Sequence, residues 1–129
     1  MTRPLFLLAL LALSACATPT EEATSKTTVP AEDAPIAEEI FYPSGELKMS
    51  GKTLAGEKHG EWTAYFKNGG IWSRNVFDKG VQNGPSTVYH SNGMLYYSGN
   101  YEAGERVGEW IFYDDDGKLA KKLNYDEEQ

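Results

Sequence analysis

The pattern of apolar and polar positions repeats every 24 residues from Phe41 to Tyr125. One aromatic, one glycine and one aliphatic position recur in every period, and no gap is needed: Phe41, Tyr65, Tyr89 and Tyr113; Gly45, Gly69, Gly93 and Gly117; Leu47, Ile71, Leu95 and Leu119. Alternating apolar residues on both sides of a glycine turn indicate antiparallel β-hairpins. A fixed period of this length indicates an array of similar units.

The turn of each hairpin can have two geometries. Asn92-Gly93 fits either a two-residue type I′ turn or a three-residue loop that ends on a left-handed glycine. Pro43 favours the three-residue loop, because proline suits the first corner of a type I turn and cannot take a positive φ. This loop predicts that Tyr89 pairs with Leu95, Tyr65 with Ile71, and Tyr113 with Leu119. Continued inward, it predicts that Ala64 pairs with Trp72 and Trp62 with Arg74.

A second kind of link joins one hairpin to the next. After the strand 95–101, the sequence predicts a longer link over 102–108, where glycines four residues apart suit a reversal with left-handed backbone. Each period then contributes two strands. The predicted fold is all-β, an elongated antiparallel meander of about seven strands over residues 41–125. Gly45, Gly69, Gly93 and Gly117 are its structural turn glycines.

The first fifteen residues predict an export signal. A start that carries Arg3 precedes the apolar stretch 5–13, which as a helix would rise only about 14 Å and could not cross a membrane. Leu13-Ser14-Ala15-Cys16 resembles the lipobox of bacterial lipoproteins. This implies cleavage between Ala15 and Cys16 and attachment of lipid, palmitate included, to Cys16. An ordinary secretory signal that happens to contain a cysteine is the alternative.

Two further segments lie outside the repeats. Residues 16–40 are rich in Thr, Ser, Ala, Pro and acidic residues and predict a disordered tether, and 126–129 form a short acidic tail. The full chain has a net charge of −7, and removal of the signal with Arg3 would make it −8. Without a basic stripe, such a chain is not expected to bind nucleic acid. Cys16 is the only cysteine, so no disulfide can form within the chain.

The repeated motif resembles a known family. Tyr89-His90-Ser91-Asn92-Gly93-Met94-Leu95, Gly99-Asn100-Tyr101 and Gly104-Glu105-Arg106-Val107-Gly108-Glu109-Trp110 resemble the second, bacterial variant of the MORN repeat. The second unit departs from the motif, with Asn75 in place of glycine, Phe77 in place of tyrosine and Pro85-Ser86 in place of an acidic or basic residue and tryptophan. The resemblance implies a β-hairpin array that serves as a binding or scaffolding module. Many bacterial members are labelled as YwqK-type antitoxins.

The side chains that could carry chemistry are few. His59 and His90 are the only histidines and occupy non-equivalent positions, so we expect neither a metal site nor a cofactor. The run Asp114-Asp115-Asp116 lacks the alternate spacing of a calcium loop and lies at a turn. Glu61 and Glu109 are a whole unit or more apart, too far for a glycosidase pair, and are expected to pair with basic residues on adjacent strands. No enzyme is indicated.

The aromatic residues remain the candidates for binding. Trp62, Trp72, Trp110, Tyr96 and Phe112 are predicted on the face opposite the repeated tyrosines. Packing between units is favoured for Trp62 and Trp110, which recur, whereas a patch of Trp62, Trp72, Arg74 and Tyr96 is the predicted partner site. The sequence thus predicts a non-enzymatic lipoprotein of the cell envelope, on the periplasmic face of the outer membrane, that binds an unknown protein. Immunity against a toxin is the alternative, and glycan binding is a third.

Overall fold

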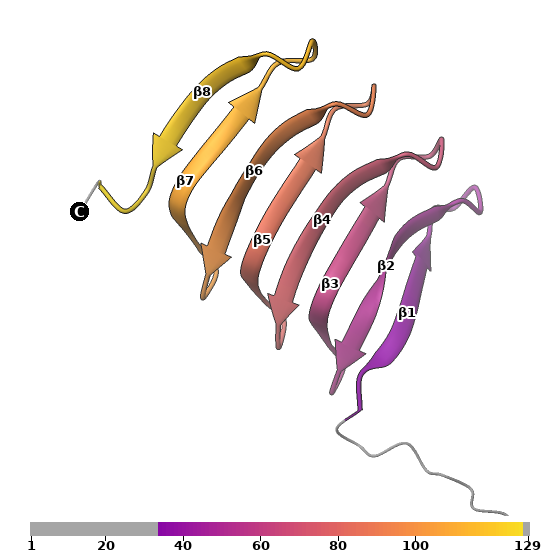
Figure 1. Ribbon diagram of the computed structural model, residues 1–129. Coiled ribbons are helices and arrows are strands. Elements are labelled where there is room, and N and C mark those ends of the chain that lie inside the picture. Colours follow the sequence, from indigo (N-terminus) through magenta and orange to yellow (C-terminus); the bar gives the residue numbers. More distant parts are fainter. Residues whose placement is uncertain (1–33, 128–129) are drawn as a thin grey trace, which may run out of the picture.

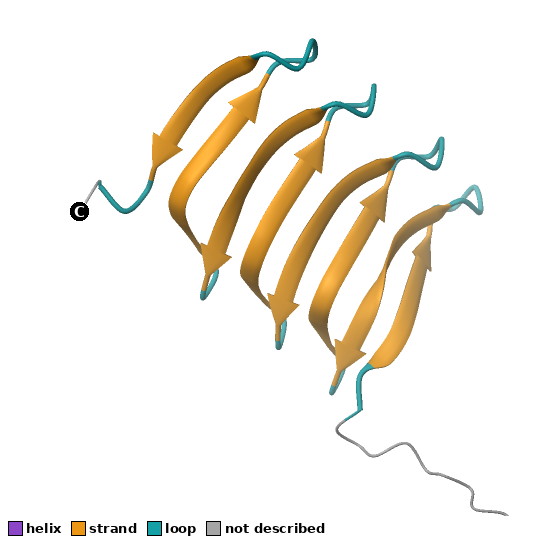
Figure 2. Ribbon diagram, in the orientation of Figure 1, coloured by secondary structure: helices purple, strands orange, loops and turns teal. Residues whose placement is uncertain are grey.

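Eight antiparallel strands follow one another in chain order in a single open sheet (Figure 1). The computed structural model describes residues 34–127, and this part of the chain contains strands and loops but no helix (Figure 2). The strands are β1 (Ile36–Phe41), β2 (Leu47–Leu54), β3 (Glu57–Tyr65), β4 (Ile71–Asp78), β5 (Val81–Tyr89), β6 (Leu95–Glu102), β7 (Glu105–Tyr113) and β8 (Leu119–Asn124). The all-β meander predicted from the sequence is confirmed.

The hairpin loops have the three-residue geometry predicted from Pro43. In the second hairpin, Gly69 N donates to Phe66 O at 2.9 Å, and Phe66 N donates to Gly70 O at 2.8 Å. Gly69 has a φ of 86°, so a type I turn precedes a left-handed glycine. Gly45, Gly93 and Gly117 also have positive φ. The predicted pairs at the loop are confirmed: Tyr65 with Ile71, Tyr89 with Leu95, and Tyr113 with Leu119.

The predicted register is wrong beyond that first pair. A β-bulge after Tyr65 and Ile71 leaves Trp72 as an extra residue, so Ala64 pairs with Ser73 and not with Trp72. Trp62 pairs with Asn75, and Arg74 pairs with Thr63. Because side chains alternate between faces along a strand, this slip of one residue moves Arg74 to the face opposite Trp62.

The links between hairpins are shorter than predicted. Two residues connect β6 to β7, Ala103 with a φ of 49° and Gly104 with a φ of 86°. Positive φ at both corners is the type I′ geometry, and Ala55 and Lys79 take the same first corner in the other two links. The second glycine of each predicted link lies inside a strand, as Gly108 does in β7. The predicted link over 102–108 is therefore mostly strand.

The first strand lies in a segment predicted to be tether. β1 occupies Ile36–Phe41 and pairs with β2, so the predicted tether of 16–40 overlaps the sheet by five residues and the strand count is eight, not about seven. Ile40 pairs with Met49, just as Ala64, two strands on, pairs with Ser73. The rest of the predicted tether up to residue 33, the predicted export signal and the end of the predicted acidic tail lie outside the described residues.

The two faces of the sheet carry different side chains. The tyrosine face holds Phe41, Tyr65, Tyr89 and Tyr113 with their aliphatic partners. The tryptophan face holds Trp62, Ala64, Trp110 and Phe112, in strict alternation with the first set. The buried apolar residues are Trp62, Ala64 and Trp110, so what core there is lies on the tryptophan face. Each unit is thus stabilised mainly by its neighbours.

Replacing Gly93 with valine is expected to lower the free energy of unfolding by more than about 1 kcal/mol. A Cβ at Gly93 would meet no atom within 4 Å, so the whole loss comes from backbone strain at a φ of 86°. Urea denaturation of the two proteins measures this difference. Ala120→Val is the matched control, because Ala120 is exposed on β8 just past a turn, and it should change stability little. Equal effects of the two substitutions would contradict the strained turn.

Candidate binding surface

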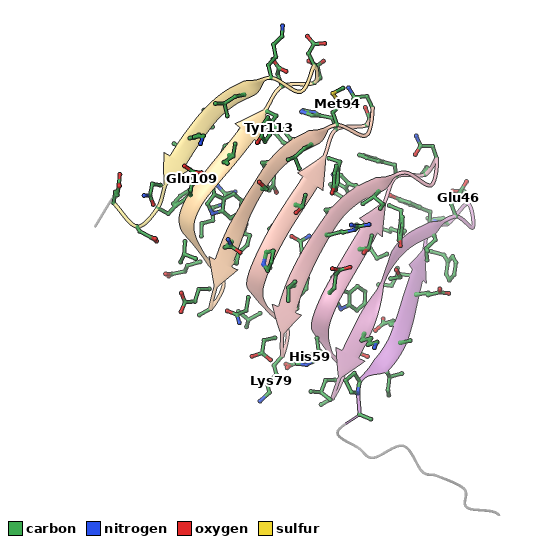
Figure 3. All side chains as sticks on the ribbon, in the orientation of Figure 1. Glu46, His59, Lys79, Met94, Glu109 and Tyr113 are labelled. Carbon is green, nitrogen blue, oxygen red and sulfur yellow. The ribbon has the colours of Figure 1, made fainter. Side chains whose placement is uncertain are left out.

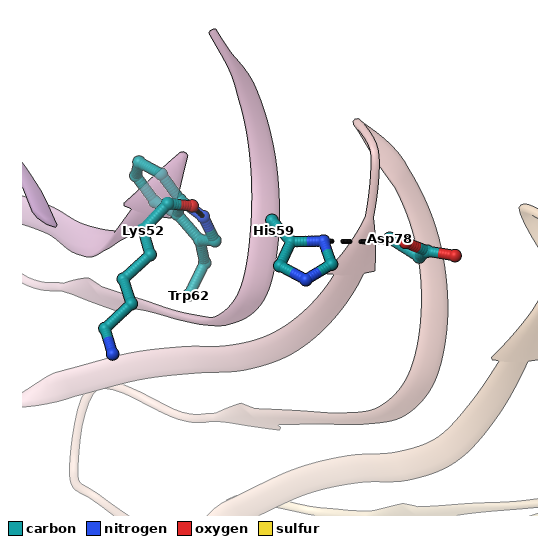
Figure 4. A network of polar contacts seen from close by, with 4 residues as sticks. All are labelled: Lys52, His59, Trp62 and Asp78. Carbon is teal, nitrogen blue, oxygen red and sulfur yellow. Dashed lines mark hydrogen bonds and ion pairs between the residues drawn. The ribbon is translucent and has the colours of Figure 1, made fainter. Parts of the chain in front are cut away.

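The two buried tryptophans of the tryptophan face lie directly on glycine backbone. Trp62 covers Gly51 on β2 and Trp110 covers Gly99 on β6, and a Cβ at either glycine would overlap the indole ring. The exposed fractions of Trp62 and Trp110 are 1% and 0%. The Nε1 of Trp62 donates to the carbonyl of Lys52 at 2.8 Å (Figure 4). These positions are therefore structural, and the prediction that the recurring tryptophans pack between units is confirmed.

The middle unit replaces this tryptophan–glycine pair with a polar network. Ser86 and Asn75 stand where the other units have tryptophan and glycine, and Ser86 Oγ donates to Asn75 Oδ1 at 2.7 Å. Gln82 Nε2 donates to the same oxygen at 2.8 Å, and Asn75 Nδ2 donates to Ser73 Oγ at 3.3 Å. Ser86 is only 2% exposed, so these polar groups need each other as partners. Both departures are visible in the sequence, and the pairing of Asn75 with Ser86 between β4 and β5 brings them together.

Basic side chains cover the aromatic rings at the link end of this face. Lys58 Nζ lies 4.6 Å from the ring centroid of Trp62, and the Arg106 guanidinium lies 4.6 Å from that of Trp110. The hydroxyls of Tyr101 and Tyr125 hold the pKa of Arg106 above its ordinary value through hydrogen bonds. Cation–π contacts of this kind shield the indoles from solvent. At the link end of the tryptophan face, the indole rings of Trp62 and Trp110 are therefore covered.

The loop end of the same face is open. Trp72 on β4 and Tyr96 on β6 are the extra residues of two equivalent bulges, and their exposed fractions are 47% and 42%. Trp72 lies 6.1 Å from the ring of Phe66, and Tyr96 lies 4.6 Å from that of His90. Tyr96 also contacts Tyr97 and Phe112. We call the four side chains Phe66, Trp72, His90 and Tyr96 the exposed aromatic row, in which Trp72 and Tyr96 are exposed and Phe66 and His90 are half-buried.

The match to known proteins follows the same units. The family described as MORN repeat variant matches residues 58–79, 82–103 and 106–127, which are three segments of 22 residues and together 66 of the 129 in the chain. Their starting points are 24 residues apart, the period of the hairpins. This chain belongs to the MORN repeat variant family. No curated protein and no solved structure matches it.

Each matched MORN repeat runs from the start of an odd-numbered strand to the end of the next even one. The hairpin β1–β2 lies outside the three matches but has the same loop, with Gly45 N donating to Tyr42 O at 2.9 Å. Adjacent MORN units are joined at their loops, where the Tyr42 hydroxyl donates to Tyr65 O at 2.9 Å and His90 Nε2 lies 3.1 Å from Tyr113 O. Proteins built from such repeats are typically non-catalytic binding modules. In this chain the repeats form one continuous sheet.

The partner site predicted from the sequence does not assemble as a single patch. Of its four residues, Trp72 and Tyr96 are exposed near the loops, but Trp62 is buried beneath Lys58. Arg74 is exposed on the tyrosine face. The predicted pairing of Trp62 with Arg74 is wrong, because the bulge at Trp72 places the two side chains on opposite faces of the sheet. The exposed aromatic row takes the place of the predicted patch.

The remaining candidates have structural roles. Asp114 Oδ1 accepts hydrogen bonds from the backbone N–H groups of Asp116 and Lys118, as expected of a turn residue. Glu109 is labelled on β7 in Figure 3 and lies 3.5 Å from Lys122 Nζ, in agreement with its predicted pairing across strands. Within residues 34–127, Glu61 makes no such ion pair.

His59 lies near the link end of the sheet (Figure 3), away from the exposed aromatic row. Its Nδ1 is 3.5 Å from Asp78 Oδ1 (Figure 4) and makes no hydrogen bond within the described part of the chain. Residues 34–127 contain no cluster of three His, Cys, Asp or Glu side chains that could hold a metal ion. They also include no helix long and apolar enough to cross a membrane. Ala15 and Cys16, the predicted cleavage and lipid-attachment residues, lie outside the described residues.

Proposed function

We propose that this MORN-repeat protein is a non-enzymatic lipoprotein of the cell envelope that binds a partner protein through the exposed aromatic row. The observation that carries the proposal is the contrast within one face. Trp62 and Trp110 are buried on glycine, whereas Trp72 and Tyr96 are 47% and 42% exposed at equivalent positions of adjacent units. The equivalent positions of the other units hold Lys48 and Ala120, so the fold of a repeat does not require a large aromatic side chain there.

The chemistry of the row suits a protein partner. Tryptophan and tyrosine combine a large apolar area with a polar group, and they are among the residues most often found at the energetic centre of protein interfaces. Trp72 on β4 and Tyr96 on β6 are two strand spacings apart, with β5 between them, which sets their backbones about 10 Å apart. An extended segment of a partner could therefore contact both by crossing the ends of the hairpins.

The cellular location is proposed from the sequence. Leu13-Ser14-Ala15-Cys16 supports export and lipid attachment at Cys16, and Ala17 in the next position supports the periplasmic face of the outer membrane. A tether from Cys16 to β1 would allow the sheet to stand clear of the lipid headgroups. Neutralisation of a toxin outside the cytoplasm would use the same anchor and the same row.

Photo-crosslinking in living cells tests the proposed surface. A photoreactive phenylalanine analogue replaces Trp72 or Tyr96 in the full chain, and in the control it replaces Arg74, which is exposed on the opposite face of β4. We expect one discrete crosslinked protein from positions 72 and 96 and none from 74. Mass spectrometry of that product distinguishes a scaffold partner from a toxin. Products from 74 alone, or a glycan product at 72, would overturn the proposal.

A further inference from the structure

The sheet has two free edges. The outer sides of β1 and β8 have no partner strand within residues 34–127, and they lie at opposite ends of the array (Figure 1). An edge strand presents unpaired backbone N–H and C=O groups that can pair with another strand. Four large apolar side chains are also exposed on these two strands: Ile36, Phe41, Leu119 and Leu123. Both edges therefore retain surface that an added strand would cover.

The two edges carry opposite charge. β1 contains Glu38 and Glu39 and no basic residue, whereas β8 contains Lys121 and Lys122 and no acidic residue. All four side chains are exposed. Charge on an edge strand commonly keeps sheets apart, and charge of one sign on both edges would do so here. Opposite signs favour contact between unlike edges instead.

We propose that β8 of one copy pairs with β1 of a second copy, so that the sheet continues from one molecule into the next. The odd-numbered strands β3, β5 and β7 each follow an even-numbered strand in the array, and β1 is the odd-numbered strand that lacks one. β8 is the even-numbered strand that lacks a following odd one. The contact between copies would therefore repeat the β6–β7 contact within the chain.

The repeat fixes the register of this pairing. Within the chain, Ser98 pairs with Ile111 and Tyr97 with Phe112. One period on from Ser98 is Lys122, and three periods back from Ile111 is Glu39, so Lys122 would lie opposite Glu39 of the second copy on the tyrosine face. By the same shift, Lys121 would lie opposite Ile40 of the second copy and diagonal to Glu38 on the tryptophan face. Opposite charges at both positions stabilise an antiparallel pair.

Like edges do not fit one another. Pairing β1 with β1 would bring glutamates together, and pairing β8 with β8 would bring lysines together, which is unfavourable in both cases. The favoured contact is head-to-tail, and such a contact generates an open chain of copies unless its rotation closes a ring. Because only six-residue strands meet, the contact is smaller than a standard protein interface and should be weak and sensitive to salt.

Charge reversal followed by mixing tests the proposal. One variant carries Glu38→Lys and Glu39→Lys, which makes both of its edges basic. The other carries Lys121→Glu and Lys122→Glu, which makes both edges acidic. Full-length chains with two different C-terminal tags are co-expressed, crosslinked in the cells with formaldehyde and purified through one tag. The recovery of the second tag measures contact between copies.

The pairing predicts a specific pattern of recovery. Two native copies should co-purify, two copies of the same variant should co-purify at least fivefold less, and the basic-edged variant should recover the acidic-edged one as well as native copies recover each other. The mixture controls for folding, since a variant that cannot fold cannot be rescued by its counterpart. The proposal is overturned by any of three results: native copies do not co-purify, two copies of one variant co-purify as well as native copies do, or the two variants do not recover each other. These outcomes do not depend on the partner of the exposed aromatic row.

Discussion

Gly99→Asn should destabilise the protein by more than about 2 kcal/mol, because the new side chain cannot share its place with the indole of Trp110. Trp110 is fully buried on the Gly99 backbone, and neighbouring aromatic side chains hold its ring from several sides. Trp110→Ser alone should lower the free energy of unfolding by about 3 kcal/mol, because it removes the largest buried side chain of the last unit. Urea denaturation of each variant measures both losses.

The combination of the two substitutions should be more stable than Gly99→Asn alone. In the middle unit the same two positions hold Asn75 and Ser86, which bond to each other at 2.7 Å. The serine substitution, harmful in the native chain, should therefore become favourable by at least about 1 kcal/mol once the asparagine is present. Adding Arg106→Gln supplies the counterpart of Gln82, which also bonds to Asn75. If the losses of Gly99→Asn and Trp110→Ser simply add, the two positions do not form one packing unit.

The hairpin loops show how much of the fold could be predicted from the sequence. The period, the asparagine–glycine turns and Pro43 predicted the loop and the first residue pair beyond it, and the structure confirms both. Loop chemistry acts only on the residues next to the loop, so it carried no information on the bulge at Trp72. That one extra residue separated Arg74 from Trp62 and divided the predicted binding patch.

Two other differences have local causes. β1 contains two glutamates and follows a stretch rich in polar residues, so its composition resembled a tether. Counting one period back from β3 would have indicated a strand ending at Phe41. The links were predicted too long because Ala103 is an unusual first corner for a type I′ turn, where asparagine, aspartate or glycine is expected. The paired substitution at Asn75 and Ser86 was visible in the sequence, but only the register shows that the two side chains meet.

Cys16→Ala should release the protein from membranes or leave it uncut. Lipid on Cys16 would be the attachment of the chain, because two or more acyl chains hold a protein stably at a bilayer. The variant should appear either in the soluble fraction or as an uncut precursor that is larger on a gel. Fractionation of cells followed by immunoblotting measures both properties.

Ser14→Ala is the matched control for this substitution, because it keeps a small residue near the proposed cleavage site and leaves Cys16 intact. It should fractionate with membranes and mature to the native size. A Cys16→Ala protein that remains in the membrane fraction at the mature size would show that the lipoprotein proposal is wrong.

The affinity of the crosslinked partner for Trp72→Ala tests the central claim most directly, that exposed aromatic residues on a rigid MORN array bind a protein. Trp72 is 47% exposed, so we expect its loss to weaken binding by about fivefold, or about 1 kcal/mol, and to leave the melting temperature nearly unchanged. Arg74→Ala, on the same strand but the opposite face, should bind as the native protein does. If Trp72→Ala binds with native affinity, or if it unfolds with no separate loss of binding, the exposed aromatic row is not the partner site.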